Sequence, residues 1–166
     1  MIVTFRIDER LIHGQVIATW LKSLGVTHLI VANDDAASNS MKQTALKLAI
    51  PRGVKCLIKG IDDSTRIVND PRCNEMRVML IAGTPEDAVK LVGQVPGIKE
   101  INLANYGSIT KPDIKGKLTI SGMVYLDNSD IRQVNKLIDT GLPVFTQKTP
   151  TDPKKLLSKM NEREGE

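Results

Sequence analysis

Six charged or polar side chains lie within ten positions near the beginning of the chain. They belong to the run RIDERLIHGQV and are Arg6, Asp8, Glu9, Arg10, His13 and Gln15. A neutral imidazole is a good nucleophile near neutral pH, because its unperturbed pKa is about 6.5. An arginine three residues earlier can hold phosphate oxygens with a planar fork of N–H donors. These residue types allow phosphoryl transfer, with His13 as nucleophile and Arg10 as the phosphate-stabilising residue.

The same run contains other groups that such a reaction needs. Gly14 lets the backbone approach an anion closely, and the free N–H groups of a helix that begins near it form a natural anion site. Asp8 can hydrogen-bond the imidazole or hold Arg10 in place, which makes it an orienting residue. Arg6, Gly14 and Gln15 are candidates for binding the substrate or a partner. On spacing alone a structural interpretation is favoured, because a histidine beside a glycine is often a helix-entry residue, and arginines near helix starts commonly form surface ion pairs.

Polar residues after later strands could face the same site, because ligands of open α/β sheets bind where the carboxyl ends of strands lead into helices. Asn33 and Asp34 are candidates for lining the pocket, although a capped turn explains them equally well. Thr84 can present its hydroxyl to the site, but it also fits the N-cap of a helix. The segment 105–107 fits a partner-docking loop or a simple turn. Asp34 and Asp35 alone do not identify the oxygen ligands that Mg²⁺ needs, so no metal site is predicted.

Short apolar runs rich in β-branched residues alternate with segments of helical spacing. The apolar runs predict strands at 2–5, 28–33, 54–58, 77–83, 100–105, 117–126 and 143–147. Helices are predicted over 14–24, 39–49, 62–68, 85–94, 129–139 and 152–160, with Gly25 and Gly141 as C-terminal stops.

This alternation is typical of an α/β fold with a mostly parallel sheet of about seven strands and helices on both faces. The connection between the strands at 100–105 and 117–126 carries glycine and proline and no convincing helix. It therefore suits a hairpin-like return and one antiparallel edge strand. A length of 166 residues fits one compact unit, so a single domain over 1–166 is expected.

The composition argues against several other classes of protein. No segment approaches the roughly 20 apolar residues that cross a bilayer, and the first residues lack the apolar region of a secretory signal, which predicts a cytosolic protein. Cys56 and Cys73 lack CxxC spacing, so neither a disulfide framework nor a zinc site is indicated. The net charge of +4 is scattered, and no zinc-finger or RNP-type pattern favours a nucleic-acid partner. His28 opens an apolar strand without nearby acids or arginines, and is interpreted as structural.

The run RIDERLIHGQVIATW resembles the N-terminal signature of the IIB components of the mannose/fructose/sorbose family of the bacterial phosphoenolpyruvate-dependent sugar phosphotransferase system (PTS). The usual form of that signature is RIDDRLIHGQV, so Glu9 keeps the charge of the more common aspartate. The resemblance continues through VANDDAA at 31–37, AIPRGVK at 49–55, AGTPEDAVKLV at 82–92 and NLANYGS at 102–108. It covers almost the whole chain and implies one IIB domain over 1–166.

The resemblance implies a phosphoryl carrier of a sugar-uptake system. A histidine is phosphorylated in that family, and the matching residue is His13. Arg10 matches the family's phosphate-contacting arginine, and Asp8 matches its acidic site residue. The phosphoryl group would come from a IIA component and pass to a sugar bound in the IIC and IID membrane components, without a cofactor. The protein would then be cytoplasmic and would meet the membrane only through those partners.

Two other functions stay open on the residues themselves. A non-catalytic module would use the same helix N-termini to hold a sugar phosphate or a nucleotide. A hydrolase would form an intermediate on the histidine that water then attacks. Neither the sugar nor the oligomeric state follows from the sequence, and the resemblance favours the Nδ1 nitrogen as the phosphorylated one.

Overall fold

The computed structural model describes residues 1–164, apart from the side chains of Gln15 and Val16. Its centre is a seven-stranded sheet with the strand order β3-β2-β4-β1-β5-β8-β9. The strands in chain order are β1 (Ile2–Asp8), β2 (His28–Ala32), β3 (Lys55–Lys59), β4 (Val78–Ala82), β5 (Ile101–Asn105), β8 (Val144–Thr146) and β9 (Lys155–Leu156). All neighbouring pairs are parallel except β8 and β9, which are antiparallel. The predicted α/β fold, with a mostly parallel sheet and an antiparallel edge, is confirmed.

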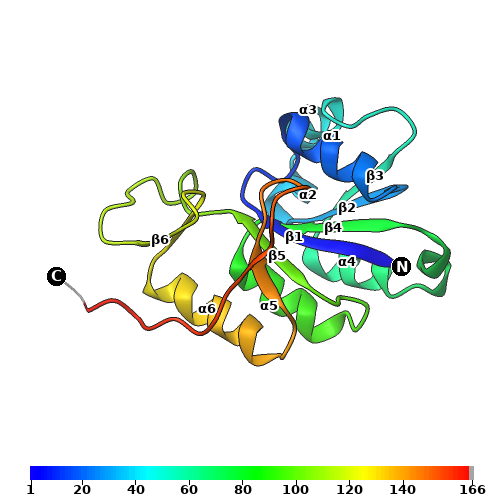
Figure 1. Ribbon diagram of the computed structural model, residues 1–166. Helices are drawn as coiled ribbons and strands as arrows, with labels where there is room; N and C mark the ends of the chain where they lie inside the picture. Colours follow the sequence, from blue (N-terminus) through cyan, green and yellow to red (C-terminus); the bar gives the residue numbers. More distant parts are fainter. Residues whose placement is uncertain (165–166) are drawn as a thin grey trace.

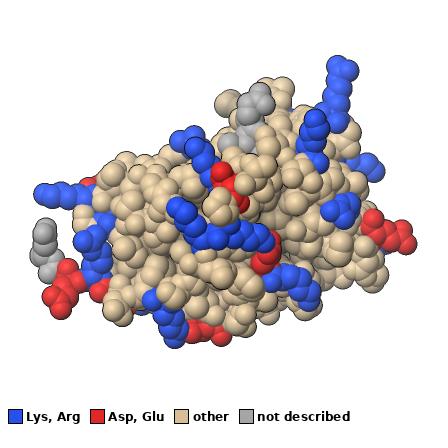
Figure 2. Space-filling view, viewed as in Figure 1, with Lys and Arg blue, Asp and Glu red and all other residues tan. Residues whose placement is uncertain are grey.

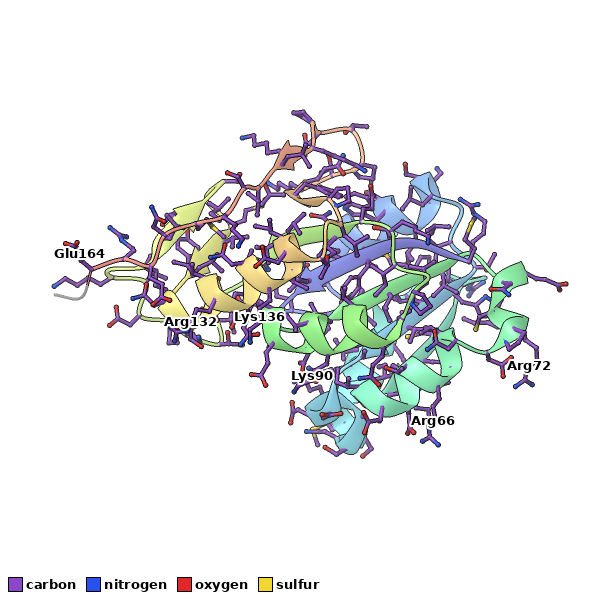
Figure 3. All side chains as sticks on the ribbon, turned by 90° about the horizontal axis from the view of Figure 1, so that it is seen from below. Arg66, Arg72, Lys90, Arg132, Lys136 and Glu164 are labelled. Carbon is purple, nitrogen blue, oxygen red and sulfur yellow. The ribbon has the colours of Figure 1, made fainter. Side chains whose placement is uncertain are left out.

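Helices cover both faces of this sheet, as the alternation of patterns predicted (Figure 1). One layer contains α1 (Gly14–Ser23), α2 (Asp34–Ser38) and α3 (Ser40–Leu48), and the other contains α4 (Ile61–Val68), α5 (Pro85–Gln94) and α6 (Asn128–Asp139). A short 3₁₀ helix, η1 (Pro71–Glu75), precedes β4. Figure 3 shows the second layer from below, with Arg66, Lys90, Arg132 and Lys136 projecting from its helices. No helix within residues 1–164 combines the length and apolar character that crossing a bilayer requires.

Strand β1 has two faces of different chemistry. Phe5 and Ile7 are buried in the apolar cluster under α4, α5 and α6. The residues between and after them, Arg6 and Asp8, are also buried, but they face the opposite side of the sheet because side chains alternate along a strand. The central strand of the sheet therefore carries two buried charges toward the α1 layer.

Side chains cap several helices where the sequence predicted helix starts. The Thr84 hydroxyl accepts a hydrogen bond from the backbone N–H of Asp87, which confirms the predicted start of α5. Asp127 and Asp130 form a reciprocal capping box at the start of α6. Gly25 and Gly141 follow α1 and α6 with φ of 58° and 79°, which confirms them as stop residues.

The predicted strand at 117–126 is wrong in its extent. The structure splits it into β6 (Leu118–Ile120) and β7 (Val124–Leu126), a separate antiparallel hairpin outside the main sheet. The turn between them needs positive φ at Ser121 and Gly122, 52° and 65°, which a continuous strand cannot include. The β6–β7 hairpin therefore does not supply the antiparallel edge strand that the sequence predicted.

The predicted helix over 152–160 is also wrong, because this segment is extended and contributes the edge strand β9. Leu157 and Met160 have the spacing of a helix face, yet both pack on the core from an extended chain. Their backbone hydrogen bonds go elsewhere: Leu157 N–H donates to Val144 O at 2.8 Å, and Met160 exchanges two bonds with the Asn135 side chain. Helix α2 was not predicted, since it is one short turn after β2.

Glycine at position 107 is required by the contact between the loop after β5 and strand β7. Gly107 has φ of 88°, and a Cβ there would lie 1.9 Å from the carbonyl oxygen of Tyr125. The neighbouring backbone is paired to the hairpin, because Tyr125 N–H donates to Tyr106 O at 2.8 Å. A side chain at 107 would therefore push this loop away from the hairpin.

We expect Gly107→Ala to lower the free energy of unfolding by at least about 2 kcal/mol, because clash and unfavourable φ act together. Gly93→Ala is the matched control, since Gly93 lies in α5 with nothing within 4 Å of its would-be Cβ. That control should instead stabilise by about 0.5–1 kcal/mol through helix propensity. Urea denaturation measures both; equal effects of the two changes would contradict the assignment.

Candidate active site

The candidate site lies at the carboxyl ends of β1 and β5, where the direction of the chain connections reverses. From β1 the chain continues through α1 to β2, toward one edge of the sheet, and from β5 it continues through α6 to β8, toward the other edge. Adjacent strands whose connections diverge in this way form the usual ligand site of open α/β sheets. The loop 9–13 lies at this point and contains the residues that the sequence singled out.

The Asp8 carboxylate is the centre of the hydrogen bonds in the site. It is fully buried at the end of β1. Its Oδ2 atom accepts from His13 Nε2 at 2.9 Å and from Nε and Nη2 of Arg6 at 3.2 Å. Its Oδ1 atom accepts from the backbone N–H of Arg10 at 3.0 Å and from Asn105 Nδ2 at 3.3 Å. Asp8 therefore joins β1, β5 and the loop that leads into α1.

Arg6 is the counter-charge of Asp8 rather than an exposed binding residue. Its side chain is 3% exposed and lies over the Trp20 ring, with the guanidinium carbon 5.6 Å from the ring centroid. Its Nη1 atom has no hydrogen-bond partner among the described residues, so Asp8 accepts all the hydrogen bonds that the structure gives this guanidinium. The predicted direct contact of Arg6 with substrate or partner has no support in this burial.

The charges of Arg6 and Asp8 stabilise each other in the interior. Burial alone would raise the pKa of Asp8, but the hydrogen bond from His13 and the charge of Arg6 outweigh it and hold that pKa below its ordinary value. Burial lowers the pKa of Arg6, which Asp8 opposes. Asp8 is thus a carboxylate at neutral pH, able only to accept hydrogen bonds.

His13 is held by one ring nitrogen, and its other ring nitrogen has no hydrogen bond to any side chain that the structure describes. Its backbone is extended at the N-cap of α1, with φ of −153° and ψ of 139°. The side chain is 25% exposed. Because a carboxylate only accepts, the Nε2 atom that faces Asp8 must carry the proton, and the lone pair of the neutral ring then lies on Nδ1. The arrangement presents a basic nitrogen on an oriented imidazole.

Arg10 lies on the outside of the same loop. Its side chain is exposed, and its guanidinium makes no hydrogen bond or ion pair with any side chain that the structure describes. Leu11, the next residue, has φ of 62°, which is unusual for a bulky residue, and its buried side chain anchors the loop. The backbone N–H of Leu11 closes a turn on Asp8 O at 3.0 Å. Arg10 is thereby displayed at a tight, anchored turn.

The remaining predicted residues lie at the start of α1 and around the candidate site. Gly14 begins α1 with φ of 51° and is exposed, whereas the side chain of Gln15 lies outside the described part of the chain. The Asn33 side chain caps α2 by accepting from Ala36 N–H at 2.8 Å. Its amide nitrogen lies over the end of β4, 2.9 Å from where a Cβ of Gly83 would lie.

The Asp34 and Thr84 side chains use their oxygens to cap helices. Asp34 Oδ1 accepts from the backbone N–H of Ile61 at 2.9 Å, which ties the end of β2 to the start of α4. The Thr84 hydroxyl accepts from Asp87 N–H at 3.0 Å. The Thr84 bond is the capping alternative that the sequence left open, whereas the Asp34 bond goes to α4 and not to the next helix along the chain. The structure gives neither side chain a hydrogen bond to His13 or Asp8. Among residues 1–164, no group of three or more His, Cys, Asp and Glu side chains is arranged to hold a metal ion.

Two residues of this region were missed as site residues by the sequence interpretation. Asn105 was considered only for a docking loop, yet its side chain donates to Asp8. Glu9 was noted only for its charge, yet its carboxylate holds the loop 108–110. The position of Asn105 at the carboxyl end of a strand was an available signal. Nothing local to Glu9 indicates a partner about a hundred positions away.

A family model for the "PTS system sorbose subfamily IIB component" matches residues 2–166. The chain belongs to this family. A probable phosphotransferase enzyme IIB component of Streptococcus pyogenes serotype M6 is 37% identical over 161 residues, which cover 96% of this chain and 99% of that protein. The crystal structure of the IIB domain of the sorbose permease of Klebsiella pneumoniae superposes with a TM-score of 0.83 at 27% identity, covering 93% of this chain and 91% of the other.

Family membership confirms the activity that the resemblance implied. The protein is a PTS IIB component of the mannose/sorbose family, a phosphotransferase that carries a phosphoryl group for sugar uptake. The system to which it belongs includes IIA and IIC/IID components. The mannose-specific EIIAB component of Escherichia coli is 34% identical over 149 residues; these cover 90% of this chain but 45% of that protein.

The pairing of Asp8 with Arg6 leads to a test by substitution and pH. Asp8→Asn should lower the free energy of unfolding by about 3–5 kcal/mol, because the Arg6 guanidinium would stay buried without a counter-charge. Asp35→Asn is the control, since Asp35 pairs with Lys42 on the exposed surface, where such pairs contribute at most about 1 kcal/mol. Urea denaturation near neutral pH measures both variants.

The difference in unfolding free energy between wild type and Asp8→Asn should also depend on pH. The pKa of Asp8 is lowered by folding, so its stabilisation is complete above the unfolded-state pKa of about 3.9 and is lost as the pH falls toward the lower folded-state pKa. The gap in unfolding free energy between wild type and Asp8→Asn should therefore shrink below about pH 4. A gap that widens on acidification would show that the carboxylate is not the stabilising form.

Proposed function

We propose that His13 carries the phosphoryl group, accepting it on Nδ1 from a phosphorylated IIA component and passing it to a sugar held by IIC and IID. The observation that carries the proposal is the hydrogen bond between Asp8 and His13 Nε2, which leaves Nδ1 as the nucleophilic nitrogen. The E. coli relative named EIIAB combines IIA and IIB in its name, which supports a IIA component as the donor.

The first transfer is a displacement at phosphorus between two imidazoles. The Nδ1 lone pair of His13 forms the new N–P bond while the N–P bond of the donor breaks, and the donor imidazole leaves with that bonding pair. Nε2 keeps its proton throughout, hydrogen-bonded to Asp8, so the imidazole ring that becomes positively charged on phosphorylation is stabilised by a buried carboxylate. In the neutral tautomer with the proton on Nε2, no proton has to leave Nδ1 before it forms the new bond.

In this proposal, Arg10 and the N-terminus of α1 stabilise the transferring phosphoryl group with positive charge. Its transition state is loose, with negative charge spread over three equatorial oxygens, so catalysis depends on positioning and on nearby positive charge. The guanidinium of Arg10 has no partner among the described side chains to compete with such oxygens. Helix α1 has no side-chain cap and no acidic residue in its first turn, which leaves its N-terminus positive.

The second transfer moves the group from His13 to a sugar hydroxyl. The hydroxyl oxygen bonds to phosphorus as the Nδ1–P bond breaks and Nδ1 regains its lone pair. The hydroxyl proton must then leave to a base on the sugar-bearing component. Two different partners must reach the same nitrogen, and the partial exposure of His13 at the rim of the sheet agrees with that need. The protein would meet the membrane only through these partners, from the cytoplasm.

The charge distribution supports short-lived encounters with the partners. Basic and acidic side chains are spread over the face seen in Figure 2 and are not gathered into one basic patch. Scattered charges of both signs favour weak, fast association over permanent binding. The alternative of a non-catalytic module for sugar phosphates or nucleotides needs no buried carboxylate behind the imidazole, which makes the carrier the better explanation of this geometry.

His13→Ala should abolish phosphorylation, and His28→Ala should not. The chain has two histidines, and His28 lies at the amino end of β2, away from the candidate site. The protein is incubated with phosphoenolpyruvate, the general phosphotransfer proteins and a IIA component, and intact mass is measured. We expect wild type and His28→Ala to gain one phosphoryl group that is acid-labile and stable in alkali. Long-range ¹H–¹⁵N spectra of the phosphorylated protein should assign it to Nδ1.

The rival functions predict other results in the same experiment. A binding module would show saturable ligand binding without a change in mass, and a hydrolase would release inorganic phosphate steadily without a sugar acceptor. A mass gain that survives in His13→Ala would reject His13 as the carrier.

Arg10→Gln should slow phosphorylation by IIA by about ten- to a hundredfold, because one charged donor to the transferring oxygens is lost. Its thermal midpoint should stay close to that of wild type, since the Arg10 side chain is exposed and the loop contact is made by its backbone N–H. Arg52→Gln is the matched control, an exposed arginine before β3 at the opposite end of the sheet. Quench-flow rates that are equal for both variants would refute the role of Arg10.

A further inference from the structure

The carboxylate of Glu9 binds three consecutive residues of a loop that is distant in sequence. Oε1 accepts from Ser108 N–H at 3.0 Å, from the Ser108 hydroxyl at 3.1 Å and from Ile109 N–H at 3.0 Å. Oε2 accepts from Thr110 N–H at 3.0 Å and from the Thr110 hydroxyl at 2.9 Å. Consecutive backbone N–H groups that converge in this way form a concave site for an anion, and here the protein's own carboxylate fills it.

Glu9 and Asp8 are neighbours in the chain, but their side chains point in opposite directions and have different partners. Asp8 faces inward to His13, whereas Glu9 faces the loop after β5, and the backbone N–H of Glu9 also donates to Asn105 O at 2.9 Å. Partial burial alone would raise the pKa of Glu9, but the hydrogen bonds from Thr110, Ile109 and Ser108 outweigh it and lower that pKa to about 2. The Glu9 carboxylate is therefore charged at any physiological pH.

Both ends of this loop are held by other contacts, so residues 108–110 are the part that depends on Glu9. On one side, Tyr106 N–H donates to Met123 O at 3.1 Å, and the Tyr106 hydroxyl donates to Asp130 at 3.0 Å. On the other side, the Lys111 ammonium group donates to Asp127 at 2.5 Å and to Asp130 at 2.9 Å. Of the four residues between these anchors, Ser108, Ile109 and Thr110 donate their backbone N–H groups to the Glu9 carboxylate.

The fixed segment presents an apolar side chain next to the active-site loop. Ile109 is 52% exposed, and its backbone N–H lies 3.0 Å from the carboxylate of Glu9, which directly precedes Arg10. An exposed apolar residue in a segment that is already rigid can be buried by a partner without the entropic cost of ordering the loop. A protein that brings a phosphoryl group to His13 must approach this rim of the sheet.

We propose that Glu9 is a positioning residue that holds segment 108–110 as a docking surface for the phosphoryl-donating IIA component, with Ile109 as its apolar contact. The inference rests on the proposed function, in which IIA is the donor and His13 the acceptor. Glu9 touches neither the imidazole nor the transferring group in this arrangement. It acts on the encounter with the donor and leaves the chemical step to Asp8, His13 and Arg10.

The first test separates donor binding from chemistry in Glu9→Gln. Glutamine keeps the size of the side chain, but its amide group cannot accept the bonds that one carboxylate oxygen now accepts. We expect the KM for phosphorylated IIA to rise by about three- to tenfold while kcat at saturating donor changes less than about twofold. Hydrogen exchange at the amides of 108–110 should accelerate. Glu9→Asp keeps the charge and should recover part of the loss in KM.

Glu100→Gln is the matched control for this change. Glu100 pairs with Lys154 on the surface and precedes β5, at the opposite end of the sheet from His13. Its KM for IIA and its exchange at 108–110 should equal those of wild type. An unchanged KM in Glu9→Gln, or an equal rise in Glu100→Gln, would overturn the proposal even if Glu9→Gln lowered the thermal midpoint.

The second test removes the apolar contact and leaves the loop in place. Ile109→Ser should raise the KM for IIA by about three- to tenfold with wild-type amide exchange at 108–110, because the side chain points to solvent and the backbone bonds remain. Leu48→Ser on α3 is the control, an exposed apolar residue far from the candidate site, and should change nothing. Ile109→Ser keeps the proposal testable even if Glu9→Gln fails to fold.

The outcomes distinguish this inference from the proposed function. If wild type accepts no phosphoryl group from IIA, the proposed function fails. If wild type is phosphorylated on His13 and Ile109→Ser keeps the wild-type KM, the docking surface alone is wrong. A rise only in the KM for the later transfer to sugar, with IIA kinetics unchanged, would assign segment 108–110 to the membrane component and also overturn the proposal.

Discussion

The buried carboxylate of Asp8 is the constraint on which the site depends. A charge in the interior is stable only when it is paired and hydrogen-bonded, and Asp8 receives that support from Arg6, Arg10 N–H, His13 and Asn105. These donors come from the central strand, from the loop after it and from the end of the neighbouring strand β5. Satisfying one carboxylate therefore fixes the distance between β1 and β5, the shape of the loop and the orientation of the imidazole at once. The order of this region is therefore a condition of folding as well as of the phosphoryl transfer proposed for His13.

Most of the sheet could be predicted from the sequence because its strands are buried on both faces. Strand β4, Val78–Ala82, is buried along its whole length and reads as an unbroken apolar run, and its helix α5 starts at a threonine cap followed by proline. The predictions of secondary structure failed where contacts with distant segments determine the conformation. Leu157 and Met160 have helical spacing, but the hydrogen bonds of Asn135 and Val144 hold that segment extended, and no local pattern reveals those partners. The hairpin of β6 and β7 was missed because its turn places Ser121 at positive φ, and a serine in the sequence does not indicate that conformation.

The residue types of the site could be predicted from the sequence, but the directions in which their side chains point could be predicted less well. His13, Arg10 and Asp8 were identified, and the structure brings all three into one loop and strand end. Arg6 was predicted to bind the substrate or a partner, although the alternation of a strand already places it on the same face as Asp8, two positions later. The two arginines differ because one belongs to β1 and is buried, whereas the other lies beyond the strand in a turn closed by Leu11. The role of Glu9 could not be predicted, since its ligands are supplied by a loop about a hundred residues away.

The distribution of charge around the imidazole follows from these positions. Arg6 and Asp8 neutralise each other in the interior, and the charge of Glu9 is directed at backbone N–H groups of the loop 108–110. Arg10 therefore remains as the charge of this run without a described partner, on the solvent side of the site. A carrier has to attract a dianionic group and release it again, so strong binding by several free cations would oppose the second transfer. In the proposed mechanism, one arginine without a described partner, in the same loop as the oriented imidazole, attracts the phosphoryl group without binding it too tightly for release. The buried pair of Arg6 and Asp8 thus holds the imidazole in place and, because its charges cancel, adds little to the positive electrostatic potential at the surface.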